Sequence, residues 1–295
     1  MRRLLLGVAV VGALGSALPQ PWHRVTPVNV RHPGAFRGPP LAESSGAIVS
    51  RAHPGQFWSL NDSGNPATLF LADTTGAIRG FVRLVGVVNT DWEAISAGPC
   101  GGQWCLYVGD LGDNRAVRRS VTIHRVVEPG DRELKAQAAR PLDSLVVRYP
   151  DGPTDAESMV VTRGEGVGII TKGRTGTVDV YWIGGTAWGA GHVTARPIGT
   201  LPIRTSLIFG QLVTDAALSD DEQILAVRTY QDIYLFRRTT PSRWLPDQPW
   251  GACSVQGFDI VGEGLAWWNR TTLLMTSEIT RIRPGAITLL ECRPP

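Results

Sequence analysis

Short apolar runs that end in polar residues recur along this chain. Five of them share a pattern of strand-forming residues that turns polar at its end: FWSLND (57–62), CLYVGD (105–110), GIITKG (168–173), LAVRTY (225–230) and LLMTSE (273–278). About fifteen to twenty residues before each run lies a second recurring piece. These pieces are ESSGAIVS (43–50), DWEAIS (91–96), DAESMVV (155–161), DAALS (215–219) and VGEGLAW (261–267). Such runs predict strands, and their recurrence predicts an architecture built from one repeated unit.

Further strand candidates accompany these pieces, so that a full repeat holds four strands. They are TLFLAD, IRGFVRLVG, SVTIHRVV, LDSLVVRYP, VDVYWI, HVTARPIGTL, DIYLFRR and AITLLEC. Helical periodicity is confined to DRELKAQAAR (131–140). Four strands per repeat, with Gly, Pro and Asp in the turns, are typical of a β-propeller blade. The pattern therefore predicts an all-β chain folded as a β-propeller of five four-stranded blades.

The two ends of the chain are expected to close the ring together. The fifth repeat holds only three strands, and the early stretch HRVTPVNV (23–30) offers a fourth. A blade shared by both ends would leave no exposed sheet edge. The alternative is a ring of six blades with one too degenerate to be seen. We predict five blades in a single domain that spans 18–295.

Acidic residues occupy matching positions at the starts of the predicted innermost strands. The first positions of the second recurring piece are Glu43, Asp91, Asp155, Asp215 and Val261. The third positions are Ser45, Glu93, Glu157, Ala217 and Glu263. First and third positions of a strand point to the same side, and the innermost strand of a propeller blade lines the central channel. We therefore expect the acids to converge at one channel mouth. The apolar runs end near the same rim and add Asp62, Asp110 and Glu278, with Lys172 and Arg228 as compensating, ligand-binding cations.

Two loops at this mouth have the composition of a metal site. GDLGDN (109–114) and NDSGN (61–65) each combine carboxylates, amides and glycines. Calcium binds about six to eight oxygen ligands of these types, but neither loop has EF-hand spacing. Ligands from several blades would therefore be needed, and plain Asx turns are the alternative. We predict a calcium-like cation or a small polar ligand, with candidate metal ligands Glu43, Asp62, Asp91, Glu93, Asp110, Asp113, Asp155, Glu157 and Asp215.

Hydrolysis is the alternative function. A protonated and an ionised carboxylate can act together on a phosphoester or a glycoside, and Glu93 with Glu157 or Glu263 is the candidate catalytic pair. The chain has no GxSxG nucleophile motif and no GxxxxGK[ST] loop, and its five histidines form no HExxH motif. A binding protein and a metal-assisted hydrolase both remain open.

Composition narrows the class of partner. The chain has 295 residues with 29 Lys and Arg against 26 Asp and Glu, and Arg2 and Arg3 account for two of the three excess positive charges. The rest of the chain is nearly neutral, so it lacks the basic footprint of a nucleic-acid-binding protein. We expect a monomer whose partner is a cation or a small polar molecule and not nucleic acid.

The N-terminus has the form of an export signal. The charged start Met1-Arg2-Arg3 precedes the apolar stretch LLLGVAVVGALGSAL, which ends in small residues suited to cleavage. This stretch is shorter than the roughly 20 residues that span a bilayer. We predict that 1–17 is a signal peptide. The mature chain is then secreted or periplasmic, with no stable membrane insertion after cleavage.

Export permits disulfides, and the chain holds four cysteines. Cys100 and Cys105 flank a predicted hairpin tip, while Cys253 and Cys292 lie late in the chain. The spacing matches neither a CxxC redox motif nor a zinc site. Two structural disulfides, Cys100–Cys105 and Cys253–Cys292, are therefore predicted.

The order of these motifs resembles a family of exported bacterial propeller proteins described as WD40-like or phytase-like repeats. The resemblance covers roughly residues 40–280. It rests on NDSG (61–64), DWEAI (91–95), GDLGDN (109–114), YPDGPTDAES (149–158), VTDAALS (213–219), RTY (228–230) and GEGLAW (262–267). It implies a propeller fold, and phytase-like propellers hold calcium in acidic loops to bind phosphate. Ala217 and Val261 depart from the acidic pattern.

Overall fold

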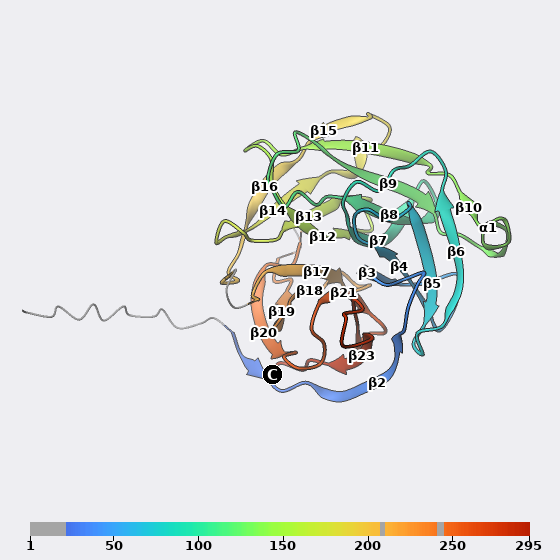
Figure 1. The fold of residues 1–295 in the computed structure, drawn as a ribbon. Coiled ribbons are helices and arrows are strands. Elements are labelled where there is room, and N and C mark those ends of the chain that lie inside the picture. Colours follow the sequence, from blue (N-terminus) through green and yellow to red (C-terminus); the bar gives the residue numbers. More distant parts are fainter. Residues whose placement is uncertain (1–21, 207–209, 241–244) are drawn as a thin grey trace, which may run out of the picture.

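Five mainly antiparallel sheets stand around a central axis in the computed structural model, which describes residues 22–206, 210–240 and 245–295 (Figure 1). The predicted five-bladed β-propeller is thereby confirmed. The predicted signal peptide, 1–17, lies outside the described residues. Within the described part of the chain, no helix has the length and apolar character needed to cross a membrane.

The first two blades each run outward from an inner strand. Blade 1 consists of β3 (Ser44–Val49), β4 (Gln56–Asn61), β5 (Thr68–Asp73) and β6 (Ile78–Leu84). Blade 2 consists of β7 (Trp92–Cys100), β8 (Gln103–Asp110), β9 (Val121–Val127) and β11 (Asp143–Arg148). Short parallel strands cover their outer edges: β10 (Ala138–Ala139) lies beside β6, and β15 (His192–Thr194) lies beside β11. Each of these edges is thus protected by a segment of the next blade.

The other blades follow the same plan. Blade 3 consists of β12 (Ala156–Val161), β13 (Val167–Thr171), β14 (Val178–Ile183) and β16 (Arg196–Leu201). Blade 4 consists of β17 (Val213–Leu218), β18 (Ile224–Thr229), β19 (Asp232–Arg237) and β20 (Gln248–Ser254). Blade 5 consists of β21 (Gly262–Trp267), β22 (Leu273–Ser277), β23 (Gly285–Glu291) and β2 (Val28–Phe36). The helical segments are α1 (Asp131–Ala136) and the 3-10 turn η1 (Gly185–Ala187).

The N-terminal segment closes the ring as predicted, but with other residues than expected. β2 pairs antiparallel with β23 and completes blade 5, whereas β1 (Arg24–Val25) forms a parallel edge beside β20 of blade 4. The predicted closing strand, 23–30, is therefore wrong in its bounds. Pro27 lies between the two strands and has no N–H to donate to a ladder, so a single continuous strand is disfavoured there.

Both predicted disulfides are present. Cys100–Cys105 joins the end of β7 to β8, and Cys253–Cys292 joins β20 of blade 4 to the residue that follows β23 of blade 5. The described residues hold no free cysteine. The second bridge closes a loop of 39 residues and ties the last strand to the neighbouring blade.

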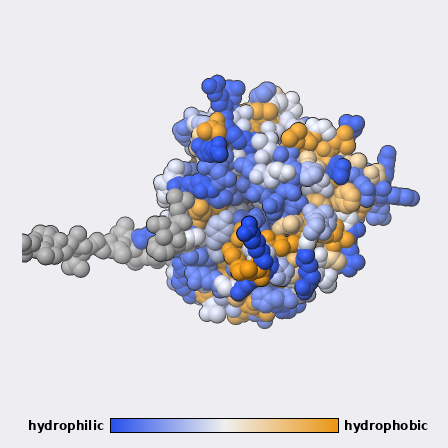
Figure 2. Space-filling view, in the orientation of Figure 1, coloured by the Kyte–Doolittle hydropathy of each residue, from blue (hydrophilic) through white to orange (hydrophobic). Residues whose placement is uncertain are grey.

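The core lies between adjacent blades. Buried apolar clusters join neighbouring sheets, for example Trp58 of blade 1 with Trp92 and Val108 of blade 2. On the face seen in Figure 2, hydrophilic residues predominate and hydrophobic residues are scattered between them. The inner strands β3, β7, β12, β17 and β21 contact one another in a closed ring around the axis. The starts of β3 and β7 meet where Ser45 donates to Glu93 at 2.8 Å, and Glu157 and Glu263, near the starts of β12 and β21, lie close enough to act on one another's pKa.

Candidate metal centre at the acidic mouth

The acidic mouth is the end of the channel at which the inner strands begin and the second strands of the blades end. Each inner strand has a bulge near its start. In blade 2, Trp92 pairs with Asp110 and Ala94 pairs with Gly109, so Glu93 is the extra residue. A bulge re-aims the side chain of the extra residue. Glu157 and Glu263 occupy the same position in blades 3 and 5.

The strand pairing corrects the alignment of the fourth repeat. Val213 pairs with Thr229 and Asp215 pairs with Arg228, so the bulge of β17 contains Thr214. Thr214 is therefore the counterpart of Glu93, and Leu212 is the counterpart of Asp91. The prediction that Asp215 begins its repeat is wrong. Asp215 follows the bulge of its strand, whereas Asp91 and Asp155 precede the bulges of theirs.

Three of the predicted metal ligands lie together. Asp62, which follows β4, and Asp91 and Glu93, at the start of β7, each bring a carboxylate oxygen within 4.8 Å of the other two. Two oxygens that each bind one calcium ion at about 2.4 Å are at most about 4.8 Å apart, so the spacing fits a shared ion. None of the three carboxylates forms an ion pair among the residues that the structure describes.

Gly112 makes room for this cluster. A Cβ at Gly112 would lie 2.5 Å from Cγ and Oδ2 of Asp91 and 2.9 Å from Cγ of Glu93. The N–H of Gly112 donates to the carbonyl of Asp91 at 3.1 Å, which holds the loop after β8 against the start of β7. The GDLGDN stretch thus shapes the cluster through its second glycine.

The two acids of the GDLGDN stretch accept hydrogen bonds from backbone N–H groups. Asp110 accepts hydrogen bonds from the N–H groups of Thr90 at 3.0 Å and Asp91 at 3.3 Å, and it pairs with Arg118 at 2.6 Å. Asp113 accepts from the N–H groups of Val117 at 2.9 Å and Arg118 at 2.7 Å. GDLGDN was predicted to be either a metal-binding loop or a plain turn. The contacts of Asp110 and Asp113 are those of a turn.

Asn61 and Asn89 were not among the predicted site residues, yet they hold the cluster in place. Oδ1 of Asn61 accepts from the N–H of Glu43 at 2.9 Å, at the position that Asp110 occupies in blade 2. Asn89 donates from Nδ2 to the carbonyl of Asp62 at 2.8 Å and accepts at Oδ1 from the N–H of Trp92 at 3.0 Å. It therefore ties the end of β4 to the start of β7. Its place three residues before Trp92 is the only signal that the sequence offers for it.

The acids of blade 3 have cationic partners. Asp155 accepts from the N–H of Asp113 at 2.9 Å and pairs with Arg174, while Nζ of Lys172 donates to Glu157. Burial raises the pKa of Glu157 to about 7, although Lys172 acts to lower it. Burial acts to lower the pKa of Lys172, but the charges of Glu157 and the other mouth acids raise it above its ordinary value. Lys172 is therefore a cation that the surrounding acids stabilise.

Three buried glutamates face this single lysine. Burial and then the charge of Glu157 raise the pKa of Glu93 well above its ordinary range. Burial and then Glu157 also raise the pKa of Glu263 to about 8. Oε1 of Glu263 accepts from the hydroxyl of Tyr230 at 2.8 Å, while its buried Oε2 has no partner among the described residues. The mouth thus contains more carboxylates than its own cations balance.

Two further acids lie at the outer edge of the mouth: the predicted metal ligand Glu43 and the predicted rim residue Glu278. Glu43 is exposed, and its Oε2 accepts from Nδ2 of Asn65 at 2.6 Å. Glu278 is half-buried, and burial, followed by the charges of Asp62 and Glu43, raises its pKa to about 7. Both acids add negative charge near the Asp62 side of the mouth.

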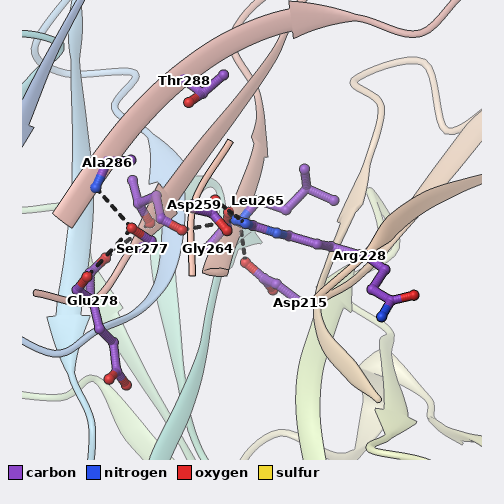
Figure 3. A network of polar contacts seen from close by, with 12 residues as sticks. Asp215, Arg228, Asp259, Gly264, Leu265, Ser277, Glu278, Ala286 and Thr288 are labelled. Carbon is purple, nitrogen blue, oxygen red and sulfur yellow. Dashed lines mark hydrogen bonds and ion pairs between the residues drawn. The ribbon is translucent and has the colours of Figure 1, made fainter. Parts of the chain in front are cut away.

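Asp215 lies inside the channel wall and not at the mouth. It is fully buried, and its carboxylate accepts from the N–H of Leu265 at 2.6 Å (Figure 3). It also accepts from the N–H of Ala216 at 2.8 Å. It follows the bulge, where blades 2 and 5 carry the small residues Ala94 and Gly264. Asp215 therefore links blade 4 to blade 5 through a hydrogen bond. Burial raises the pKa of Asp215 well above the ordinary range.

Arg228 was predicted to bind a ligand, and the structure places it between blades 4 and 5. Its side chain has no exposed surface. Nη1 donates to the carbonyls of Gly264 at 2.7 Å and Thr276 at 2.8 Å, and Nη2 pairs with Asp259 at 2.5 Å (Figure 3). Contacts with blade 5 and its preceding loop therefore occupy both amino groups of Arg228.

Comparisons with known proteins add little to this description. No family model matches the chain, and no curated protein matches its sequence. Among solved structures, the chain is similar to the crystal structure of the WD40 β-propeller domain of Doa1, at 15% identity over 85% of this chain and 67% of that chain, with a TM-score of 0.38. The five-bladed fold rests on the strand pairing of the chain itself, and the resemblance to exported bacterial propellers stays a prediction.

Proposed function

We propose that this chain is an exported β-propeller that binds a divalent cation, calcium in particular, through Asp62, Asp91 and Glu93. The observation that carries the proposal is that carboxylates from two blades share a space of 4.8 Å and have no ion-pair partner among the described residues. Export is proposed from the signal-like N-terminus, and the two disulfides agree with an oxidising compartment.

Electrostatics favour a bound cation at this place. Burial and then the charge of Asp62 raise the pKa of Asp91, and burial with the charges of Glu157 and Asp62 does the same for Glu93. A divalent ion would reverse both effects, because an opposite charge at contact distance favours the ionised carboxylate. Oxygen ligands in a flexible arrangement suit calcium, whereas magnesium needs near-octahedral geometry.

The proposed site is open on one side. Asp62 and Asp91 are half-buried, whereas Glu93 is buried beneath them, with Oε2 accepting from the hydroxyl of Ser45 at 2.8 Å. Calcium takes about six to eight oxygen ligands, so three side chains leave positions for water or for the oxygens of a small polar ligand. We propose that such a ligand binds through the cation at the open side.

Calcium titration of chelator-treated protein tests the proposal. At about a hundred times its dissociation constant, a ligand that binds only the folded state adds about 2.7 kcal/mol, which raises Tm by roughly 5 °C in a domain of this size. Asp91→Asn should remove the heat of binding in calorimetry and the rise in Tm. Asp131→Asn, an equivalent change at an exposed helix residue, should keep both. Identical melting curves in calcium and in chelator would contradict the proposal.

Metal-assisted hydrolysis of a phosphoester or glycoside is the second candidate. The observation that favours it is the pKa of about 7 for Glu157 and about 8 for Glu263, since acid–base catalysts work best with a pKa near the operating pH. Glu157 is 1% exposed and already paired with Lys172, so a substrate would have to displace that contact. The cation-binding proposal does not need this displacement.

Aryl phosphates and aryl glycosides test this candidate with calcium-loaded protein. If the mouth is catalytic, Glu263→Gln should lose turnover, and Asp131→Asn should retain it. The same preparations should be checked for calcium binding by calorimetry. If the protein binds calcium but hydrolyses none of these substrates, the hydrolase candidate is contradicted and cation binding is the function of the mouth.

A further inference from the structure

A cavity opens at the other end of the channel from the acidic mouth. Its volume is about 530 Å³, and the C-terminal halves of all five inner strands line it, together with the loops that follow them. We call it the distal cavity. Glu93 lies near the start of β7 and Gly98 of the same strand lines the distal cavity. At about 3.3 Å per residue, Gly98 lies roughly 16 Å of strand beyond Glu93, and Ile95, the first lining residue of β7, lies roughly 7 Å beyond it.

A packed layer divides the distal cavity from the acidic mouth. A Cβ on Gly264 of blade 5 would lie 3.1 Å from Cβ of Ala47 in blade 1, so these inner strands are in close contact. The fully buried carboxylate of Asp215 fills the same layer and accepts the N–H of Leu265. These contacts lie between the distal cavity and the acidic mouth, and substitutions at the two ends test the two sites separately.

Tryptophans form flat walls in the distal cavity. Trp104, Trp267 and Trp268 line it and are each half-buried. Nε1 of Trp267 donates to the carbonyl of Ala217 at 3.1 Å, which fixes this ring against β17. The guanidinium of Arg51 lies 4.8 Å from the ring centroid of Trp104. These contacts hold apolar planes in place before any ligand binds.

The charges around the distal cavity balance one another. Its charged lining residues among those described are Arg51, Arg163, Asp220 and Glu222. The backbone N–H of Arg163 donates to Glu222 at 2.5 Å, and its Nη2 donates to the carbonyl of Asp220 at 2.6 Å. Two basic and two acidic residues give no net preference for an anion or a cation. The cavity differs in this from the acidic mouth.

Several hydrogen-bond donors in the distal cavity lack partners. Ser96 lines it and is 8% exposed, and its hydroxyl has no hydrogen bond within the described part of the chain. The indole N–H groups of Trp104 and Trp268 likewise have no partner among the described residues. A ligand that covers these donors from water must supply acceptor oxygens, because a donor that is buried without a partner costs free energy.

We propose that the distal cavity binds a neutral carbohydrate of two or three sugar rings. The C–H face of a sugar packs against an indole plane, and its hydroxyl and ring oxygens accept the free N–H and O–H groups. An aromatic hydrocarbon would fill the planes but would leave the hydroxyl of Ser96 unpaired. A volume of about 530 Å³ lies within the range of about 300–1,000 Å³ that is typical of small-molecule sites.

Tryptophan fluorescence and calorimetry test this proposal with named probes. Maltotriose, cellotriose, xylotriose and triacetylchitotriose serve as neutral probes, trigalacturonic acid as a charged one, and anilinonaphthalenesulfonate as an aromatic one. At least one neutral trisaccharide should bind at millimolar concentration or below and change the fluorescence. Trp268→Ala should weaken that binding by at least about tenfold, which corresponds to about 1.4 kcal/mol, and Trp268→Phe should weaken it less.

Matched variants separate this site from the acidic mouth. Ser96→Ala removes one hydroxyl and should also weaken saccharide binding, which keeps the test valid if Trp268→Ala fails to fold. Asp91→Asn should leave saccharide binding unchanged, and Trp268→Ala should leave calcium binding unchanged. The proposal is overturned if no neutral trisaccharide binds, if the charged or the aromatic probe alone binds, or if both cavity variants bind as the wild type does.

Discussion

The acidic mouth has two halves that are built from the same residue types but differ in charge balance. In the paired half, at blades 2 and 3, three acids have a cationic partner: Asp110–Arg118, Asp155–Arg174 and Glu157–Lys172. In the unpaired half, at blades 1 and 2, Asp62, Asp91 and Glu93 have none among the described residues. The paired half is complete by itself, whereas the unpaired half carries charge that a bound cation would balance.

The difference comes from the loops that follow the second strand of each blade. The loop after β8 contributes Arg118, and the loop after β13 contributes Lys172 and Arg174. The loop after β4 (62–67) has no basic residue, and Asp62 stands at its start, where blade 3 has Lys172. The position of an acid in the repeat therefore does not decide its role. The partner that the neighbouring loop supplies does.

Removal of a partner from the paired half should have the largest effect. Lys172→Met leaves Glu157 buried without its cation, and the loss of one partner of a buried ion pair costs about 3–5 kcal/mol. Denaturant unfolding measures this cost. The double variant Lys172→Met, Glu157→Gln should recover most of it, since no uncompensated charge remains. Equal destabilisation in the single and double variants would show that the pair does not act through charge.

Glu263 should make stability depend on pH. Burial raises its pKa in the folded state from 4.5 to about 8, so the protonated carboxyl is favoured by folding. Its full contribution is present below pH 4.5 and is lost as the pH rises to about 8. One pKa unit corresponds to about 1.4 kcal/mol. The change in unfolding free energy that Glu263→Gln causes should therefore be more favourable at pH 8 than at pH 5, by an amount on the order of a few kcal/mol.

The measurement for Glu263 is the unfolding free energy at both pH values in chelator. Asp131→Asn removes an exposed carboxylate and serves as the control, with the same small effect at both pH values. A Glu263→Gln variant that is equally stabilised at pH 5 and pH 8 would contradict the raised pKa.

Gly112→Ala should abolish calcium binding by the unpaired half without removing any carboxylate. The added Cβ would meet Asp91 at 2.5 Å, so the carboxylates must shift and the spacing for a shared ion is lost. We expect the stabilisation by saturating calcium, about 2.7 kcal/mol at a hundredfold excess over the dissociation constant, to disappear. Gly164→Ala is the matched control, because a Cβ there meets nothing within 4 Å. Retained calcium stabilisation in Gly112→Ala would place the ion elsewhere.

Asp62→Lys should convert the unpaired half into a paired one, with the smallest effect on stability. It places a lysine where blade 3 has Lys172, beside Asp91 and Glu93. Thermal unfolding in chelator should show a gain of about 1 kcal/mol or less, as is usual for a half-exposed pair, and calcium should no longer raise Tm. Asp62→Asn removes the ligand without adding charge and should lose the calcium effect without the gain.

Much of this protein follows from its sequence alone. The recurring strand pieces predict five blades, because each four-stranded sheet needs neighbours to bury its apolar faces. The cysteine positions predict both disulfides, and the acids before β3, β7 and β12 predict an acidic mouth. The sequence also predicted that an N-terminal strand closes the ring, but the closing strand is Val28–Phe36 and not 23–30.

Only the tertiary structure decided which acids can share an ion. A bulge in each inner strand shifts its register by one residue and aims Glu93, Glu157 and Glu263 inward, and spacing along the chain does not reveal a bulge. Asp110 and Asp155 match Asp62 and Asp91 in type, but contacts with backbone N–H groups and arginines from other segments occupy them. The charge that a carboxylate offers to a ligand depends on what lies within hydrogen-bond distance, and folding, not residue order, sets those neighbours.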